Sequence, residues 1–184
     1  FNIYMIHVNK DGLFLQSDNN QYKIDMNDFS ANVNGKQIMF DFVINSLHGT
    51  PGEDGKIQAC LDLLNIKYSS CGVFTSALTF DKVATKKYLE NTANYMAKMY
   101  VANYGKEVDI DYIEKEIGFP CFVKPNTAGS SYGVTKVYEK DKIIDAVNLA
   151  YTEDKTVIVE EFIEGIEVSC GVLKTSSKTY VFPI

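Results

Sequence analysis

Two neighbouring features of the chain combine residue types that bind phosphate anions. Lys124 ends a short apolar run, Cys121–Val123, and a few residues later Gly129–Gly133 reads Gly-Ser-Ser-Tyr-Gly. Small residues let backbone N–H groups approach an anion closely, and a lysine adds positive charge. The pattern is not the Walker type, because no Gly-Lys-Ser/Thr follows the loop. These residues indicate a candidate site for nucleotide phosphates, and a simple turn remains the alternative.

Acidic residues lie near the end of a second apolar run. Val157–Ile163 contains Glu160 and Glu161, and Glu167 opens the next stretch. A strand edge can present backbone groups to adenine, and a carboxylate can accept hydrogen bonds from ribose hydroxyls. From spacing alone, however, solvated acids at the end of a strand are the favoured interpretation.

A histidine and two acids form a third candidate. His48 precedes Gly49, and Gly52–Gly55 reads Gly-Glu-Asp-Gly between an apolar run and a predicted helix. Ligands favour the carboxyl ends of strands in a parallel sheet, so this segment could bind one. A turn that caps the helix explains the same residues equally well.

The elements that must position these residues alternate between strand and helix. The expected strands are Ile3–Val8, Leu13–Gln16, Ile38–Leu47, Ile66–Tyr68, Cys121–Lys124, Val134–Tyr138, Thr156–Ile163, Glu167–Lys174 and Thr179–Pro183. The expected helices are Glu53–Leu64, Thr79–Met99, Ile110–Ile117 and Lys142–Tyr151, the last with Asp141 as N-cap. The polar stretch 17–36 is expected to be mostly loop. This order favours a parallel sheet first and an antiparallel α+β lobe second, with a boundary between residues 76 and 82.

Length and composition bound the class of protein. The 184 residues are 46% hydrophobic and 23% charged, which suits one large or two small globular domains. A net charge of −6 argues against nucleic-acid binding, and no apolar run reaches the ~18 residues of a membrane span. The start resembles no signal peptide and lacks an initiator Met, so we expect part of a longer, cytoplasmic protein. The four cysteines are expected to be buried free thiols.

Taken together, the motifs resemble the D-alanine–D-alanine ligase family of the ATP-grasp superfamily. The resemblance rests on five segments in the family's order, namely Leu47–Gln58, Ser76–Lys82, Gly118–Pro125, Gly129–Val134 and Val157–Val168. The motif at His48–Gly55 separates these ligases from most other ATP-grasp enzymes. The implied fold is α/β: an N-terminal, Rossmann-like pre-ATP-grasp domain with a parallel sheet (1–78), then the α+β central nucleotide-binding lobe of an ATP-grasp fold (79–184). The family's first strand and its C-terminal lobe would be absent from the chain.

The resemblance also assigns roles around the phosphates. Lys82 and Lys124 would contact the phosphates of ATP beneath a mobile loop that carries Ser130 and Ser131. Ser131 would also face the substrate as a catalytic residue. His48 would be a second catalytic residue, near the first D-alanine.

Further roles concern the nucleoside. Glu160 would accept a hydrogen bond from the adenine amino group. Glu161 and Ile163 would offer backbone hydrogen bonds to adenine, and Glu167 would hold the ribose.

The implied activity is the ATP-dependent joining of two D-alanines through an acylphosphate, for peptidoglycan precursor synthesis. The cofactors would be ATP and Mg²⁺, with the metal ligands in the absent lobe and none in this chain. Members of the family often form homodimers. We expect the 184 residues alone to be inactive. The alternatives are a D-alanine–D-lactate ligase, another ATP-grasp carboxylate–amine ligase, and a non-catalytic nucleotide-binding fragment.

Overall fold

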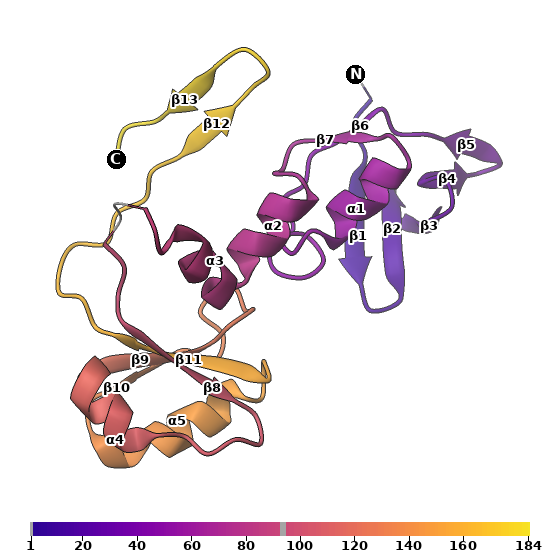
Figure 1. Ribbon diagram of the computed structural model, residues 1–184. Coiled ribbons are helices and arrows are strands. Elements are labelled where there is room, and N and C mark those ends of the chain that lie inside the picture. Colours follow the sequence, from indigo (N-terminus) through magenta and orange to yellow (C-terminus); the bar gives the residue numbers. More distant parts are fainter. Residues whose placement is uncertain (1, 93–94) are drawn as a thin grey trace.

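The structure is a computed structural model that describes residues 2–92 and 95–184 (Figure 1). Its N-terminal part is an antiparallel meander of five short strands in chain order. These strands are β1 (Met5–Asn9), β2 (Gly12–Ser17), β3 (Asn20–Asp25), β4 (Ser30–Val33) and β5 (Lys36–Ile38). Helix α1 (Lys56–Leu63) places Ile57 and Leu61 in one hydrophobic cluster with Leu15 and Phe29. The periodicity predicted this helix correctly.

The prediction of a parallel sheet is wrong for most of this part. Among the described residues, one parallel pair joins β6 (Phe42–Val43) to β7 (Lys67–Tyr68). Stretch 17–36, expected as loop, supplies β3 and β4, because its Asp and Asn residues occupy tight turns. Asp18 and Asn34 have φ angles of 51° and 52° there. Strands joined by such short turns pair antiparallel, since a parallel connection needs about a dozen residues or more.

The expected core strand Ile38–Leu47 is also wrong in extent and burial. Only its first residue and the two residues of β6 are in strands, and Phe42 and Ile44 are 52% and 78% exposed. Within the described part of the chain β6 pairs with β7 alone. The run is covered on one side only, because Ile38, Phe40 and Val43 pack against the hydrophobic cluster while residues 39, 41 and 42 are exposed. The prediction was based on hydrophobicity, but apolar residues can also be exposed, so an apolar run does not by itself predict a buried strand.

Two helices connect the N-terminal part to the rest of the chain. Helix α2 (Val73–Phe80) ends at Asp81, whose side chain accepts a hydrogen bond of 2.7 Å from the backbone N–H of Ala84. This N-cap begins helix α3 (Lys82–Leu89). The single helix expected from Thr79 to Met99 is therefore wrong in extent, and strand β8 (Met99–Asn103) follows. Residues 93–94 of that expectation lie outside the described residues.

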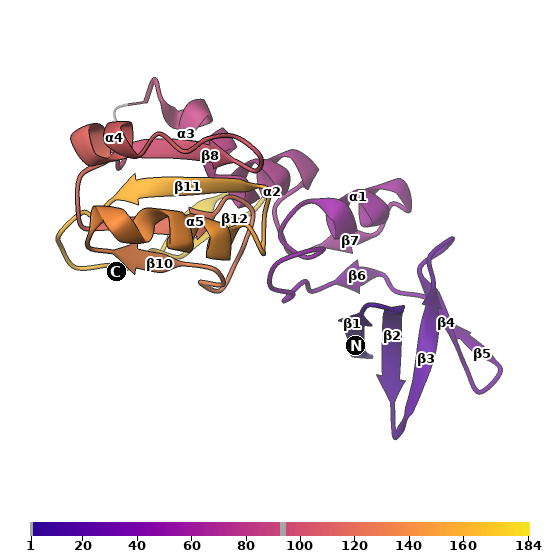
Figure 2. The same cartoon turned by 90° about the horizontal axis from the view of Figure 1, so that it is seen from below.

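The second part contains a four-stranded sheet in the order β10-β9-β11-β8. Its strands pair antiparallel, as the sequence predicted, but β8 was not among the expected strands. Strand β9 is Cys121–Pro125, β10 is Thr135–Val137 and β11 is Thr156–Glu161. Helices α4 (Ile110–Tyr112) and α5 (Ile143–Ala150) cover one side of the sheet, and α3 lies on the other (Figures 1 and 2). The core between the sheet and α5 includes the fully buried Cys121, Val123, Val157 and Ile143.

Of two helix ends predicted in this lobe, the end at Gly118 is as expected and the start at Asp141 is not. A π-helical turn, Ile113–Ile117, extends α4 and closes at Gly118, whose φ of 77° permits the turn, as expected. Asp141 is not the N-cap of α5, so that prediction is wrong. A 3-10 turn over Lys140–Lys142 precedes the helix, and Asp141 pairs with Lys142 at 3.1 Å instead.

The last strands form a separate ribbon. Strands β12 (Val172–Lys174) and β13 (Thr179–Val181) pair antiparallel and project away from the four-stranded sheet (Figure 1). Every residue in the stretch 162–184 is exposed. None of the described helices combines the length and apolar character needed to cross a membrane.

Candidate functional site

The alternation of strand β9 decides which of its residues face the candidate site. Cys121, Val123 and Pro125 are buried against the helices, so Phe122 and Lys124 point to the opposite face of the sheet. In the antiparallel register Phe122 lies opposite Glu160 and Lys124 lies opposite Ile158. Lys124 and Glu160 are therefore diagonal neighbours on one face, within reach of a long side chain.

Glu160 joins two lysines on this face. Its Oε2 lies 2.5 Å from Nζ of Lys124, and its Oε1 lies 3.0 Å from Nζ of Lys86. The Glu160 side chain is 18% exposed. Burial alone would raise the pKa of Glu160, but the hydrogen bonds and charges of Lys124 and Lys86 together hold this pKa below its ordinary value.

Lys82 lies half-buried where helix α3 meets the end of β9. Its ammonium donates hydrogen bonds to the backbone carbonyls of Pro125, Asn126 and Ala128 at 3.3, 3.0 and 2.9 Å. Burial, and next the charge of Lys124, lower the pKa of Lys82. The structure thus places both lysines near one another, and it engages Lys82 with the root of the glycine-rich loop.

Asn126 fixes this junction. Its side-chain Oδ1 accepts a hydrogen bond from the N–H of Val83 at 2.9 Å, and its carbonyl accepts one from the N–H of Lys82 at 3.4 Å. Both donors belong to the first turn of α3, whose N–H groups have no partners within the helix. The buried amide therefore joins α3 to the strand that carries Lys124.

The loop Gly129–Gly133 has an unusual backbone. Ser130, Ser131 and Gly133 have φ angles of 49°, 59° and 68°, and both serines are exposed. An ideal Cβ on Gly129 would lie 3.5 Å from Oε2 of Glu53 and 4.0 Å from the backbone nitrogen of Gly49. The fold therefore brings this loop beside the histidine motif, which is about 80 residues away in the sequence.

The histidine motif folds as a tight loop. The N–H of Gly49 donates to Oε2 of Glu53 at 2.5 Å, and the carbonyl of Gly49 accepts from the N–H groups of Gly52 and Glu53. Gly55, with φ of 89°, precedes the first turn of α1, so the segment does cap that helix. His48 is exposed. Both interpretations of this segment are thus compatible with the structure.

The remaining predicted residues lie at the end of β11 and in the segment after it. Oε1 of Glu161 accepts a hydrogen bond of 2.7 Å from the N–H of Lys98, and the N–H of Glu161 donates to the carbonyl of Lys98 at 3.1 Å. Ile163 is 60% exposed and Glu167 is exposed. In the described part of the chain, neither residue forms a side-chain hydrogen bond or ion pair with the Lys124–Glu160 pair.

Two residues near this face escaped the sequence interpretation: Lys86 and Asn126. The signal for Lys86 was its position four residues after Lys82, which places both lysines on one face of a helix. No local signal marks Asn126, because its role depends on the docking of α3 against the sheet.

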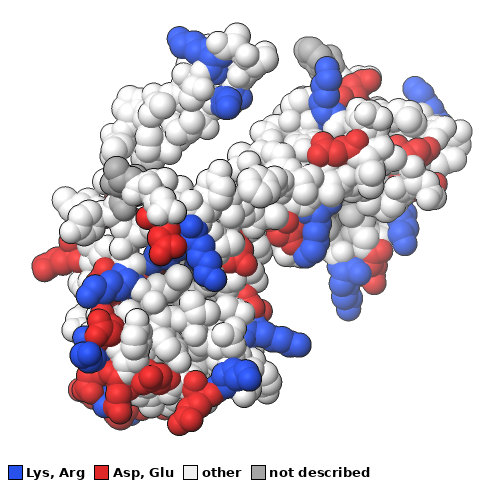
Figure 3. All heavy atoms as spheres, in the orientation of Figure 1, with Lys and Arg blue, Asp and Glu red and all other residues white. Residues whose placement is uncertain are grey.

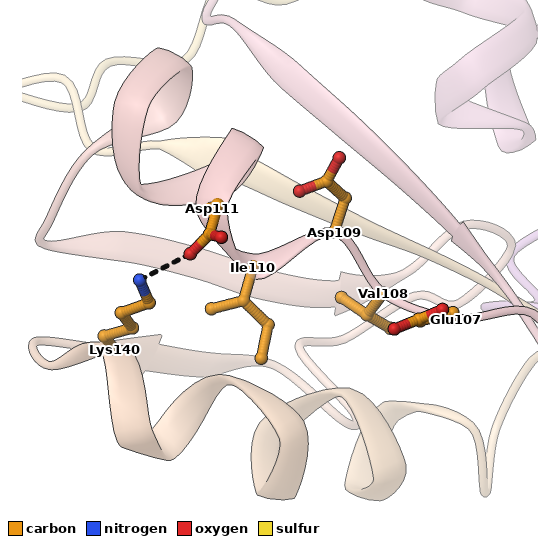
Figure 4. Close-up of a pocket in the computed structure, with 6 residues that line it drawn as sticks. All are labelled: Glu107, Val108, Asp109, Ile110, Asp111 and Lys140. Carbon is orange, nitrogen blue, oxygen red and sulfur yellow. Dashed lines mark hydrogen bonds and ion pairs between the residues drawn. The ribbon is translucent and has the colours of Figure 1, made fainter.

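A surface hollow of the central lobe lies away from these residues. It has a volume of about 560 Å³ and is lined by Glu107, Val108, Asp109, Ile110, Asp111 and Lys140 (Figure 4). Lys140 donates to Asp111 at 2.7 Å, which lowers the pKa of Asp111. These residues belong to a surface rich in both charge signs (Figure 3), and the hollow shares no residue with the site on β9 and β11. Its lining has three acids, Glu107, Asp109 and Asp111, and one lysine, so its charge does not favour an anion.

No described group of three or more His, Cys, Asp or Glu residues could hold a metal ion. The carboxylates of the site are separated or paired with lysines, as Glu160 is. The residues on this face therefore do not fit a metal centre of their own, and no metal ligand is assigned to them.

The Glu160 pair should make the stability of the protein depend on pH. The pKa of Glu160 in the folded protein lies below the ordinary value of 4.5. The contribution of its ion pairs to the free energy of unfolding is therefore present above that pH and is lost as the pH falls. We expect Glu160→Gln to lower the free energy of unfolding by about 1–3 kcal/mol at pH 7. We also expect the variant to lose less stability than the original protein between pH 7 and pH 3.

Urea unfolding at several pH values, followed by circular dichroism, measures this. Glu164→Gln, which changes an exposed glutamate, is the control. Parallel pH curves for the Glu160→Gln variant and the original protein would contradict the ion-pair contribution.

Two family models match the chain. "D-ala D-ala ligase N-terminus" matches residues 1–71, and "D-ala D-ala ligase C-terminus" matches residues 85–183. Among curated relatives, the D-alanine--D-alanine ligase of Flavobacterium johnsoniae is 42% identical over 100% of this chain and 57% of its own length. That of Phocaeicola vulgatus is 45% identical over 91% of this chain and 52% of its own length. The chain thus spans about half the length of the curated relatives it matches.

Solved structures give the same result. The D-alanyl-alanine synthetase A of Vibrio cholerae superimposes with a TM-score of 0.86 at 28% identity, covering 98% of this chain and 56% of that one. The VanG D-Ala:D-Ser ligase of Enterococcus faecalis gives 0.84 at 30% identity, covering 98% and 58%. A D-alanine--D-alanine ligase of Bacillus anthracis complexed with ATP gives 0.61 at 34% identity, covering 68% and 42%.

Proposed function

This chain belongs to the D-alanine–D-alanine ligase family, and we propose that it supplies the nucleotide-binding part of an enzyme that joins two D-alanines at the expense of ATP. The observation that carries the proposal is the Lys124–Glu160 pair, which lies on the sheet face opposite the hydrophobic core. It places a cation for phosphates and an acceptor for an amino group on neighbouring strands. The ATP complex of the Bacillus anthracis relative supports the choice of nucleotide.

We assign the phosphates to the lysines and the loop. Lys124 would leave Glu160 to contact the phosphates, and Lys82 would join it from the start of α3. Two cations at this point would offset the repulsion between a carboxylate and the triphosphate and stabilise the charge that develops during transfer. Ser130 and Ser131 lie in the exposed loop that would close over the phosphates and exclude water.

The nucleoside would lie along β11 and the segment after it. Glu160 would accept a hydrogen bond from the adenine amino group. Glu161 already donates its N–H to Lys98, so its carbonyl is the group we assign to adenine, together with the N–H of Ile163. Glu167 would contact the ribose after the exposed segment closes on the ligand.

The reaction would proceed in two displacements. A carboxylate oxygen of one D-alanine attacks the γ-phosphorus, the bond to the leaving oxygen of ADP breaks, and an acylphosphate forms. The amine of the second D-alanine then attacks the acyl carbon, phosphate leaves, and the amine loses a proton. We place His48 and Ser131 next to the first D-alanine, because the loop and the histidine motif lie side by side.

The setting of the enzyme follows from this activity. Mg²⁺ would neutralise phosphate charge when bound, and no residue of this chain is assigned to it. The product would serve peptidoglycan precursor synthesis in the cytoplasm, and the enzyme would be a homodimer.

We place the domain boundary at residues 78 and 79, which lie between the two separate hydrophobic clusters.

The direct test uses the full-length protein with ATP, Mg²⁺ and D-alanine. We expect phosphate release that depends on D-alanine, and D-alanyl-D-alanine in the mass spectrum. The 184-residue chain alone should bind ATP weakly and release no phosphate above background. Hydrolysis of ATP without a dipeptide would contradict the ligase assignment.

One observation favours a second candidate, which is a ligase with another second substrate. The VanG D-Ala:D-Ser ligase is nearly as similar in structure as the D-alanyl-alanine synthetase. D-serine and D-lactate should therefore be offered in competition with D-alanine. A dominant D-alanyl-D-serine or D-alanyl-D-lactate product would replace the first assignment with this one.

A further inference from the structure

Lys86 is a charged side chain that none of the roles above uses. It lies one helical turn after Lys82 on α3, and 16% of its side chain is exposed. Its Nζ donates to Oε1 of Glu160 at 3.0 Å and also donates to the backbone carbonyl of Ala97. Helix α3, the segment before β8, and strand β11 therefore meet at one ammonium group.

The second lysine matters once a nucleotide binds. Glu160 now shares its two oxygens between Lys124 and Lys86. Phosphates that draw Lys124 away would remove one of these partners. A carboxylate that is 18% exposed and has no cation is costly, and it tends to take up a proton. Lys86 contacts the other oxygen from a different element, so it can stay in place while Lys124 moves.

We propose that Lys86 is a positioning residue for nucleotide recognition. It keeps Glu160 ionised and oriented toward the adenine amino group while Lys124 binds phosphate. The inference rests on the proposed function, in which Glu160 accepts a hydrogen bond from adenine. A carboxylate oxygen has two lone pairs, so Glu160 can accept from Lys86 and from adenine together.

The same arrangement gives a preference for adenine. Guanine presents a carbonyl oxygen where adenine presents its amino group. An ionised, fixed carboxylate attracts the amino group and repels the carbonyl oxygen. A protonated or rotated Glu160 loses this distinction, because a protonated carboxyl can donate to a carbonyl oxygen.

The test compares Lys86→Met with Lys86→Arg in the full-length enzyme. Methionine keeps a long apolar stem but lacks the charge. We expect Lys86→Met to raise KM for ATP on the order of tenfold to a hundredfold, with kcat changed by less than about threefold. Its preference for ATP over GTP, measured as the ratio of kcat/KM values, should fall. Lys86→Arg should restore both quantities toward those of the original enzyme.

The matched control is Lys87→Met, which changes the exposed neighbour on the same helix and should leave KM and selectivity unchanged. If the original enzyme is active and Lys86→Met has an unchanged KM for ATP, the role of Lys86 is overturned while the proposed function stands. A loss of kcat at constant KM would do the same. If the original enzyme forms no dipeptide, the proposed function itself fails. If Lys86→Met does not fold, Lys86→Gln takes its place. An unchanged preference of Lys86→Gln for ATP over GTP would then overturn the inference.

Discussion

Replacing Lys124 by alanine in the full-length enzyme should lower kcat/KM for ATP by about 10²- to 10³-fold. Among the described residues Lys124 pairs with Glu160 alone, so it needs to leave one partner to contact a triphosphate. Its loss removes charge that stabilises the transferring phosphoryl group. It also leaves Glu160 with Lys86 alone, so affinity for the nucleotide should fall together with turnover.

The fold should survive this change, because the Lys124 side chain lies on the face opposite the hydrophobic core. Steady-state kinetics with varied ATP, together with circular dichroism of the purified variant, measure both expectations. Lys155→Ala removes an exposed lysine just before β11 and serves as the matched control. Kinetics unchanged from the original enzyme would remove Lys124 from the phosphate site.

The second large effect is expected at Gly52, in the histidine motif. An ideal Cβ on Gly52 would lie 2.3 Å from Cβ of Leu47 and 2.7 Å from its backbone oxygen. The carbonyl of Gly52 also accepts hydrogen bonds from Gln58 at 2.7 Å and from Asn45 at 2.8 Å. A methyl group cannot fit unless the loop moves, and that movement would break these bonds. We expect Gly52→Ala to lower the free energy of unfolding by about 1–3 kcal/mol.

The displaced loop would also move His48, so kcat/KM for D-alanine should fall more than kcat/KM for ATP. Urea unfolding and two-substrate kinetics separate these effects. Gly165→Ala is the control, because a Cβ at that glycine meets nothing within 4 Å. If Gly52→Ala were as stable and as active as Gly165→Ala, close packing of the motif would be refuted.

Local patterns predicted the central lobe well. Strands β9 and β11 followed from short apolar runs bounded by polar residues, and the antiparallel pairing followed from the order of the elements. Lys124 and Glu160 were both singled out from the sequence, and the structure joins them in one ion pair. Such features depend on a few consecutive residues, which is why the sequence reveals them.

Features that depend on tertiary contact were not predicted. Lys86 and Glu160 are 74 residues apart, and their contact requires α3 to dock on the sheet. The sequence predicted β1 and β2 of the meander but missed β3 and β4, because these two strands are short and polar and the turns at Asp18 and Asn34 looked like loop. Ile38–Leu47 was misassigned because strong hydrophobicity was taken as burial. The composition of a segment does not determine its burial, because burial depends on the elements that pack against it.

Cys121 gives the central lobe an internal reporter. It is the first residue of β9, the strand that carries Lys124; its side chain is fully buried, and burial raises the pKa of its thiol to about 11. Cys71 and Cys170 are exposed, so the expectation of four buried thiols is wrong for these two. Alkylating reagents attack the thiolate, so the exposed thiols react first and Cys121 reacts only when the sheet opens. The rate at which Cys121 is modified therefore measures how often this lobe opens, and slower modification in the presence of a nucleotide would measure the stabilisation that the ligand gives.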